Sequence, residues 1–244
     1  MSFSDIHMHI LYGTDDGPKT REAMFEMVDT AYKNGIRLIC ATPHFHPVIF
    51  GDNRESAVHA FEVLTQYCKE QYTDLSLFLG NELFYVNEAV SWLKNGICRP
   101  AGNTRHVLVE FSVTASEDTI AENVDRLLNM GYVPIIAHAE RYRKLSAGRL
   151  WVIRQNGALV QMNASSLCFK PTMFCQNNRV KNMLNKGLVD FISTDAHGVT
   201  RRPPEMKEAY DYLLKKYGKE YADNLCRDNA IKLLCHDKNL EENQ

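Results

Sequence analysis

Short apolar runs rich in β-branched residues alternate with stretches of helical spacing, and this alternation constrains the fold most. The runs predict seven strands, at residues 3–7, 37–42, 75–80, 106–111, 133–138, 158–162 and 189–194. Strands separated by helices at this spacing form a mostly parallel sheet with the helices outside. Seven of them suit a closed or nearly closed α/β barrel better than an open sheet.

The helices between the strands are marked by apolar spacing and by their ends. Helices are predicted at 20–34, 118–130 and 181–186, where apolar residues recur at helical intervals. A glycine follows each of them directly, which favours the end of a helix. The segment from about Pro204 onward predicts two further helices.

The size and composition fit one domain without a membrane segment. The chain has 244 residues, 45% of them hydrophobic, so we expect one substantial core and a single domain over residues 1–244. The net charge of -2 gives no broad attraction to nucleic acid or to an anionic membrane. No apolar run reaches the roughly 18 residues of a membrane span. The seven cysteines lack a C-x-x-C pair, which favours a reducing compartment, so we expect a cytoplasmic protein.

The opening stretch SDIHMHILYGTDDG, residues 4–17, joins an apolar pattern to a polar one. Side chains alternate faces along a strand, so His7 and His9 share one face while Ile6 and Met8 share the other. One face suits a core, and the opposite face suits a cation.

Polar side chains follow every predicted strand, including Asn163 after the strand at 158–162. The carboxyl ends of barrel strands converge on one rim, where active sites lie, so we expect these side chains to meet there. The candidate ligands are His7, His9, His44, Glu82, Glu110, His138, Asp195 and His197, with Asp16 as a ninth. Because one ion takes fewer ligands than this, the set implies a bridged cluster of two or three ions.

The ligand types narrow the chemistry. Histidines and carboxylates without thiolates suit manganese, magnesium, iron or zinc, and structural zinc is disfavoured because no cysteines are paired. Clusters of such ions hold the attacking and leaving oxygens in phosphoryl transfer. Motifs for a cysteine nucleophile (C-x5-R), a phosphate-binding glycine loop and a G-x-S-x-G serine elbow are absent.

Other polar residues near the strand ends are interpreted as supporting, capping, hydrogen-bonding or phosphate-binding residues rather than as metal ligands. Asp5 and Asp15 either support the ligands from behind or cap local backbone, and His46 is better explained as an ordinary hydrogen-bonding residue. Two arginines, Arg141 and Arg202, are predicted to grip a phosphate group, because guanidinium groups bind phosphate in a bidentate way.

Seven stretches carry a family resemblance: DIHMHIL…DDGPKTREA, ATPHF, GNELFY, VLVEFS, PIIAHAERY, NASSL…KP and STDAH…RRPPEMKEAYD. They resemble the PHP (polymerase and histidinol phosphatase) superfamily. More narrowly, they resemble its bacterial capsule- and exopolysaccharide-locus branch, the manganese-dependent protein-tyrosine phosphatases of CpsB/CapC type. The motifs keep the family's order from Asp5 to about Leu234.

The resemblance implies a distorted (β/α)7 barrel that holds a trinuclear metal centre. The family's ligands fall on His7, His9, Asp16, His44, Glu82, Glu110, His138, Asp195 and His197, and its phosphate-gripping arginines fall on Arg141 and Arg202. The implied cofactor is Mn2+, with Fe or Zn also compatible. The implied partner is the phosphotyrosine tail of a bacterial tyrosine kinase that regulates polysaccharide export. In this reaction, His44 or His197 would pass a proton to the leaving oxygen through a water.

Three alternatives remain at the level of sequence. The first is a small-molecule phosphatase of the same fold, such as histidinol-phosphate phosphatase, in which only the rim loops differ. The second is a non-catalytic module that docks the kinase, although a structural site needs no open coordination positions. The third, a nucleic-acid phosphoesterase, is disfavoured by the mildly acidic charge.

Overall fold

All the strands run parallel and form two sheets in the computed structural model, which describes residues 2–168 and 174–235. The predicted domain therefore extends beyond the described part at Met1, 169–173 and 236–244. The first sheet has the order β1-β2-β4, at Phe3–Met8, Ile36–Ala41 and Ser76–Leu79. The second has the order β3-β5-β6-β7-β8-β9, at His44–Phe45, Glu82–Phe84, His106–Glu110, Val133–Ile136, Leu159–Asn163 and Phe191–Ser193.

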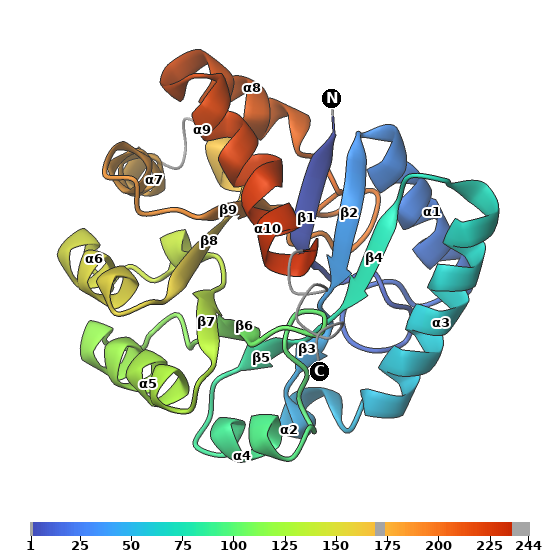
Figure 1. Cartoon of the computed structure of the whole chain (residues 1–244), viewed down its shortest axis with the longest axis horizontal. Coiled ribbons are helices and arrows are strands. Elements are labelled where there is room, and N and C mark those ends of the chain that lie inside the picture. Colours follow the sequence, from blue (N-terminus) through green and yellow to red (C-terminus); the bar gives the residue numbers. More distant parts are fainter. Residues whose placement is uncertain (1, 169–173, 236–244) are drawn as a thin grey trace, which may run out of the picture.

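The two sheets are parts of one curled layer, shaped as a half-barrel (Figure 1). After β4, the Gly80 amide donates to the carbonyl of Ala41 at 2.9 Å, which continues the pairing of β2 and β4 toward β3 and β5. On the other side, Met8 forms an isolated parallel bridge with Ala196, just after β9. These backbone contacts bring the first and last strands together.

The seven predicted strands appear as β1, β2, β4, β6, β7, β8 and β9. His44 and Glu82 follow β2 and β4 as predicted, but they also lie in two further short strands, β3 and β5, that were not predicted. These strands have only two and three residues, too few for any period to be visible in the sequence.

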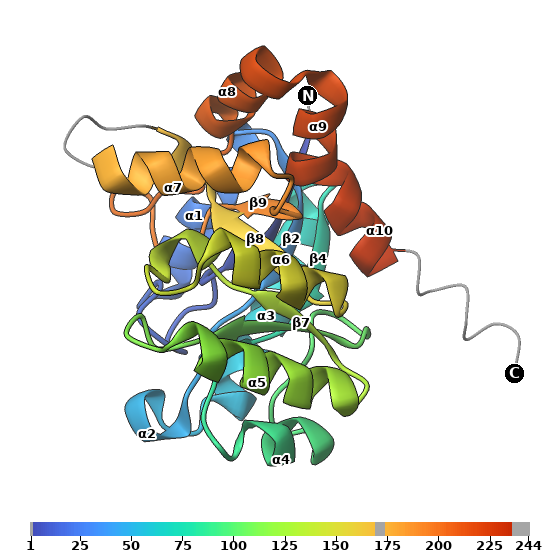
Figure 2. The same cartoon turned by 90° about the vertical axis from the view of Figure 1, so that its left-hand side faces the viewer.

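Most helices cover the outside of the curled sheet, and the last one packs against its interior side (Figures 1 and 2). The helices are α1 Arg21–Lys33, α2 Pro47–Phe50, α3 Arg54–Gln71, α4 Ala89–Lys94, α5 Glu117–Asn129, α6 Ala147–Gln155, α7 Phe174–Asn185, α8 Lys207–Tyr217, α9 Lys219–Asp223 and α10 Asn229–Cys235. Two 3-10 turns, η1 at Ala139–Arg141 and η2 at Ala164–Leu167, follow β7 and β8, and a π-helical turn, η4 at Asn224–Asp228, joins α9 to α10. No helix in the described ranges is long and apolar enough to cross a membrane.

The helices predicted at 20–34 and 118–130 match α1 and α5 within a residue or two at each end. Side chains at both starts explain these limits, since Thr20 and Ser116 each accept a hydrogen bond from a backbone amide of the first turn. The helix predicted at 181–186 is longer than expected and begins at Phe174.

The buried apolar residues form two clusters. The larger lies between the sheet and the outer helices, while the smaller joins strands of both sheets to α10. Strands from opposite parts of the curl can touch only across its concave face, so the smaller cluster fills the interior. Its members are Ile6, Leu38, Cys40, Ala101, Leu108, Ile135, Ala137, Phe191, Ala230, Leu233 and Leu234.

The position of Ile6 corrects the alternation expected for β1. Met8 belongs to the larger cluster as predicted, but Ile6 belongs to the interior cluster. The pairing register of β1 with β2 shifts between Asp5 and Met8, and an irregularity of this kind interrupts strict alternation.

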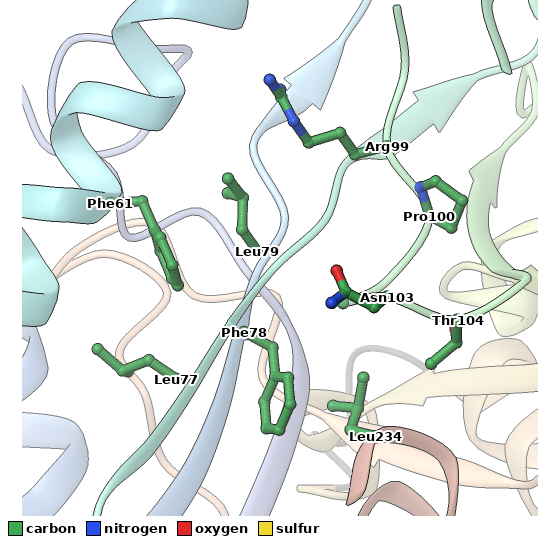
Figure 3. A pocket seen from close by; sticks show the side chains of 10 residues that line it. Phe61, Leu77, Phe78, Leu79, Arg99, Pro100, Asn103, Thr104 and Leu234 are labelled. Atoms are coloured by element: carbon green, nitrogen blue, oxygen red, sulfur yellow. The ribbon is translucent and has the colours of Figure 1, made fainter. Parts of the chain in front are cut away.

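A cavity of about 530 Å³ lies beside the interior cluster (Figure 3). Leu77, Phe78 and Leu79 of β4 line it together with Phe61 of α3 and Leu234 of α10. Its lining includes none of the candidate ligands, so it is separate from the polar rim.

Candidate metal centre

Three groups of ionisable side chains meet at the carboxyl ends of the strands. Within the described residues, the possible ligand atoms of each group lie within 4.8 Å of one another. The groups are His9, Asp16, His44 and His197; His7, His9 and Asp195; and His44, Glu82 and Glu110. His9 and His44 each belong to two groups, so the three groups form one continuous cluster.

Glu82 lies at the centre of the cluster and is fully buried. Its Oε1 atom lies 3.2 Å from Nε2 of His7 and 3.0 Å from Nε2 of His138. Its Oε2 atom lies 3.2 Å from Nε2 of His9 and 3.0 Å from Nδ1 of His44. In the pairing of β3 with β5, His44 is directly opposite Glu82, so the two short strands position this contact.

The donor atoms of the cluster face one another, as ligands of shared cations do. The Nε2 atoms of His7 and His9 are 3.1 Å apart, and each lies 3.5 Å from Oδ1 of Asp195. Oε2 of Glu82 is buried among imidazoles but makes no aligned hydrogen bond. Buried lone pairs that converge in this way need protons or a cation between them. The nitrogen and carboxylate donors therefore fit a centre of several manganese, iron or zinc ions.

Residues behind the cluster hold the histidine rings in orientation. Nδ1 of His7 lies 3.1 Å from Oε1 of Gln161, and Nδ1 of His9 lies 2.7 Å from Oδ2 of Asp15. The same carboxylate oxygen of Asp15 accepts from the backbone amide of His44 at 2.8 Å. Such contacts fix the tautomer and direction of a metal-binding ring. Gln161 was not predicted, although a polar residue inside the apolar run 158–162 was a visible signal.

The loop after β1 passes close to the strand that precedes it. A Cβ atom at Gly17 would lie 2.2 Å from the carbonyl oxygen of His9, so only glycine fits here. This close approach brings Asp16 into the cluster. Its Oδ1 atom lies 3.3 Å from Nε2 of His197 and 3.7 Å from Nε2 of His44.

Backbone strain is concentrated at the cluster. Among the described residues, the non-glycine residues with positive φ are His138, Asp195 and Arg202, at 34°, 53° and 57°. Left-handed backbone costs roughly 1–2 kcal/mol for most residues. Strain of this kind persists where the surroundings enforce it, which is typical of functional sites.

Asp195 joins the histidines to two guanidinium groups. Its Oδ1 atom faces His7 and His9, while its Oδ2 atom accepts from Nη2 of Arg141 at 2.8 Å and Nη2 of Arg202 at 3.2 Å. The side chains of the two arginines are 32% and 36% exposed. They therefore lie between the buried cluster and the solvent.

The concentrated charge shifts the pKa values of the cluster. Burial opposes the charged form of His138, but hydrogen bonds with Glu110 and Glu82 outweigh it and raise the pKa to about 9. Burial likewise opposes ionisation of Glu82, but the positive charges of His7 and His44 hold its pKa well below the usual value. Protons on these histidines compete with a bound cation.

Two other predicted residues have definite surroundings. Asp5 is buried, and its Oδ2 atom accepts from Oγ1 of Thr194 at 2.5 Å while Oδ1 accepts from the amide of His7 at 3.1 Å. Burial, partly offset by these hydrogen bonds, raises the pKa of Asp5 to about 6. The Asp5 carboxylate therefore links β1 to the segment after β9. His46 belongs to none of the three groups, and its ring lies against Phe84 at 4.9 Å between centroids.

Comparisons with known proteins show what the chain is similar to. The family model "Capsular polysaccharide synthesis, CpsB/CapC" matches residues 3–235. The tyrosine-protein phosphatase CpsB of Streptococcus agalactiae serotype III is 31% identical over 237 residues, which cover 94% of this chain and 97% of the relative. The CpsB phosphatase of Streptococcus pneumoniae is 32% identical with the same coverage.

The fold is also similar to a solved structure over most of the chain. That structure is one of the crystal structures of YwqE from Bacillus subtilis and CpsB from Streptococcus pneumoniae, "unique metal-dependent tyrosine phosphatases". The TM-score is 0.84 at 28% sequence identity, over 94% of this chain and 93% of that one. The likeness thus includes both the curled sheet and the rim that carries the cluster.

Proposed function

The chain belongs to the CpsB/CapC family of capsular polysaccharide synthesis proteins, and we propose that it is a metal-dependent protein-tyrosine phosphatase. It would hydrolyse the phosphoric monoester of tyrosine. The observation that carries this proposal is the buried ligand cluster with the guanidinium groups of Arg141 and Arg202 on its solvent side. The substrate is supported by relatives named as tyrosine phosphatases.

The cluster would hold two or three Mn2+ ions, with Fe or Zn as possible occupants. Three adjoining ligand groups support the larger number. When bound, the ions supply positive charge and lower the pKa of water, so that a nucleophile exists at neutral pH. The proposed ligands are His7, His9, Asp16, His44, Glu82, Glu110, His138, Asp195 and His197.

The two arginines would bind and orient the phosphate group. Each donates from Nη2 to Asp195, and Nη1 of Arg202 also lies 2.8 Å from Nε2 of His197. The remaining N–H groups of the two planar guanidinium groups are left for phosphate oxygens. Asp195 thereby fixes both side chains before the substrate arrives. Their charge would also offset the negative charge that the phosphoryl oxygens carry in the transition state.

The leaving group makes modest demands on the protein. A tyrosyl oxygen has a pKa near 10, so it needs less protonation than an alkoxide would. His44 and His197 lie toward the solvent side, with side chains 16% and 7% exposed. We infer that either could pass a proton to the leaving oxygen through a water.

We also infer a distorted (β/α)7 barrel. If β2 with β3 and β4 with β5 are treated as two interrupted strands, seven strand positions surround the interior cluster. The proposed partner is the phosphotyrosine tail of a bacterial tyrosine kinase that controls capsular or exopolysaccharide synthesis. A cytoplasmic location would give access to such a tail.

The proposal is tested first with metal-stripped protein. We expect hydrolysis of a phosphotyrosyl peptide to require added Mn2+ and to exceed hydrolysis of histidinol phosphate. Activity that survives thorough chelation would contradict the metal-dependent mechanism. A preference for histidinol phosphate would keep the site but move the function to small-molecule metabolism.

A matched pair of variants tests the arginine assignment. Arg202→Ala removes a proposed phosphate ligand, and we expect kcat/KM for the peptide to fall roughly 100-fold or more, as for loss of a charge-stabilising donor. Arg201→Ala changes an exposed neighbouring arginine and should have little effect. Equal losses in the two variants would count against a specific role for Arg202.

A further inference from the structure

Two consecutive apolar side chains are unusually exposed at the rim. Val48 is 88% exposed and Ile49 is 64% exposed, both on the short helix α2. Single exposed apolar residues are ordinary, but an adjacent exposed pair adjoining a functional site is a candidate for binding.

The segment that carries them is fixed to the proposed active site. It directly follows β3, and the ring of Phe50 stacks on the ring of His44 with centroids 5.0 Å apart and planes inclined by 5°. Beyond it, Nδ2 of Asn53 donates to the carbonyl oxygens of His44 at 2.8 Å and Thr14 at 3.0 Å. The segment that carries the apolar pair therefore borders the ligand cluster.

The rim is chemically divided. Residues 43–51, with the sequence PHFHPVIFG, contain no Asp, Glu, Lys or Arg, and we call this segment the apolar lip. The guanidinium groups of Arg141 and Arg202 converge instead on Asp195, after β9. Figure 1 shows α2 beside β3 and away from β9 around the curled sheet. A phosphate group suits the guanidinium side, and an uncharged group suits the lip.

We propose that the apolar lip, through Val48 and Ile49, binds an apolar side chain that flanks the phosphotyrosine in a peptide substrate. This specificity rests on the proposed phosphatase function. Residues of an extended peptide advance about 3.3 Å each, so a flanking residue remains close to the site when the phosphate is bound. A charged flanking residue would lose solvent against the lip without gaining a partner there.

The test compares kcat/KM for three aryl phosphate substrates. They are a peptide with isoleucine on both sides of the phosphotyrosine, the same peptide with aspartate there, and p-nitrophenyl phosphate, which has no flanking residue. With the Mn2+-loaded wild-type protein we expect the isoleucine peptide to exceed the aspartate peptide by about tenfold, a typical discrimination for one apolar contact. The double variant Val48→Ser/Ile49→Ser should abolish this preference and change the rate on p-nitrophenyl phosphate less than about twofold.

A second apolar pair provides the control. Trp151 and Val152 of α6 are 53% and 42% exposed and lie on a different side of the molecule (Figure 1). The variant Trp151→Ser/Val152→Ser should retain the full peptide preference.

Two outcomes would overturn the lip proposal. They are an unchanged peptide preference in the Val48→Ser/Ile49→Ser variant and an equal loss of activity on all three substrates in that variant. Failure of the wild-type protein to hydrolyse any of the three with Mn2+ would instead refute the phosphatase function, and the lip proposal with it.

Discussion

The two ends of the same strands bury opposite kinds of side chain. The chain through β2 and β3 carries Leu38 in the interior cluster and His44 in the ligand cluster at the rim. On β1 the change falls between neighbours, since Ile6 of the interior cluster directly precedes His7 of the ligand cluster. Burial of apolar side chains is favourable by itself, whereas burial of charged groups requires partners.

The comparison indicates that stability and function are separated along the strands. The interior end needs no bound ligand for its stability, because its apolar side chains are buried against one another. At the rim, the imidazoles and carboxylates surrounding Glu82 depend on protons or cations to balance their charge. Substitutions at the rim should therefore reduce metal binding and activity, whereas substitutions at the interior end should reduce stability.

The largest effect is expected for Glu82→Gln. The substitution keeps the shape but removes the charge that faces four histidines, so we expect bound Mn2+ to decrease and kcat to fall by at least about 100-fold, beyond the usual loss for an outer-shell change. Metal analysis after gel filtration and a peptide assay measure both. Glu88→Gln, at an exposed carboxylate, is the control. Normal metal content and turnover in Glu82→Gln would contradict the central role of this residue.

The interior end should respond in stability. Leu38 is 4% exposed, and Leu38→Ala should lower the free energy of unfolding by about 2–5 kcal/mol through lost burial and a residual cavity. Denaturant unfolding measures this loss. Metal content and kcat of the folded variant should stay within about twofold of wild type, since Leu38 belongs to the interior cluster and to none of the candidate ligand groups. A fall in metal content as large as that of Glu82→Gln would show that the ends are coupled.

The smallest effect concerns pH. His138 has a pKa of about 9 in the metal-free fold against an ordinary value of 6.5, so the folded state binds more protons than the unfolded state between these values. Its stabilisation of the metal-free protein is complete below pH 6.5 and is lost as the pH rises through 9. Mn2+ competes with those protons, so its stabilising effect should grow over the same range.

Thermal unfolding at pH 6.5 and 9, with and without Mn2+, measures this difference. We expect the Mn2+-induced rise in Tm to be about 5 °C larger at pH 9. His59→Ala, at an exposed histidine outside the cluster, should behave like wild type. A Mn2+ effect that does not change with pH would show that proton competition at the cluster is negligible.

Much of the fold could be predicted because apolar residues recur at a characteristic spacing along each strand and helix. The long strands and the helices 20–34 and 118–130 were visible for this reason. The short strands β3 and β5 were not, since pairing between distant segments creates them. The expectation that Ile6 shares a face with Met8 was wrong for a related reason, because a register shift against β2 is a property of two strands together.

By itself, the sequence determined which residue types follow the strands, and hence the candidate ligands and the chemistry they suit. Only the tertiary structure decided which of those side chains lie close enough to share a cation and which residues support them. Gln161 contacts His7, from which it is separated by 154 positions in the chain, and Asp195 accepts hydrogen bonds from both Arg141 and Arg202. The regular spacing of apolar residues in a strand or helix depends on neighbours along the chain. Contacts between distant segments depend instead on how the parallel strands curl and on the register at which they pair.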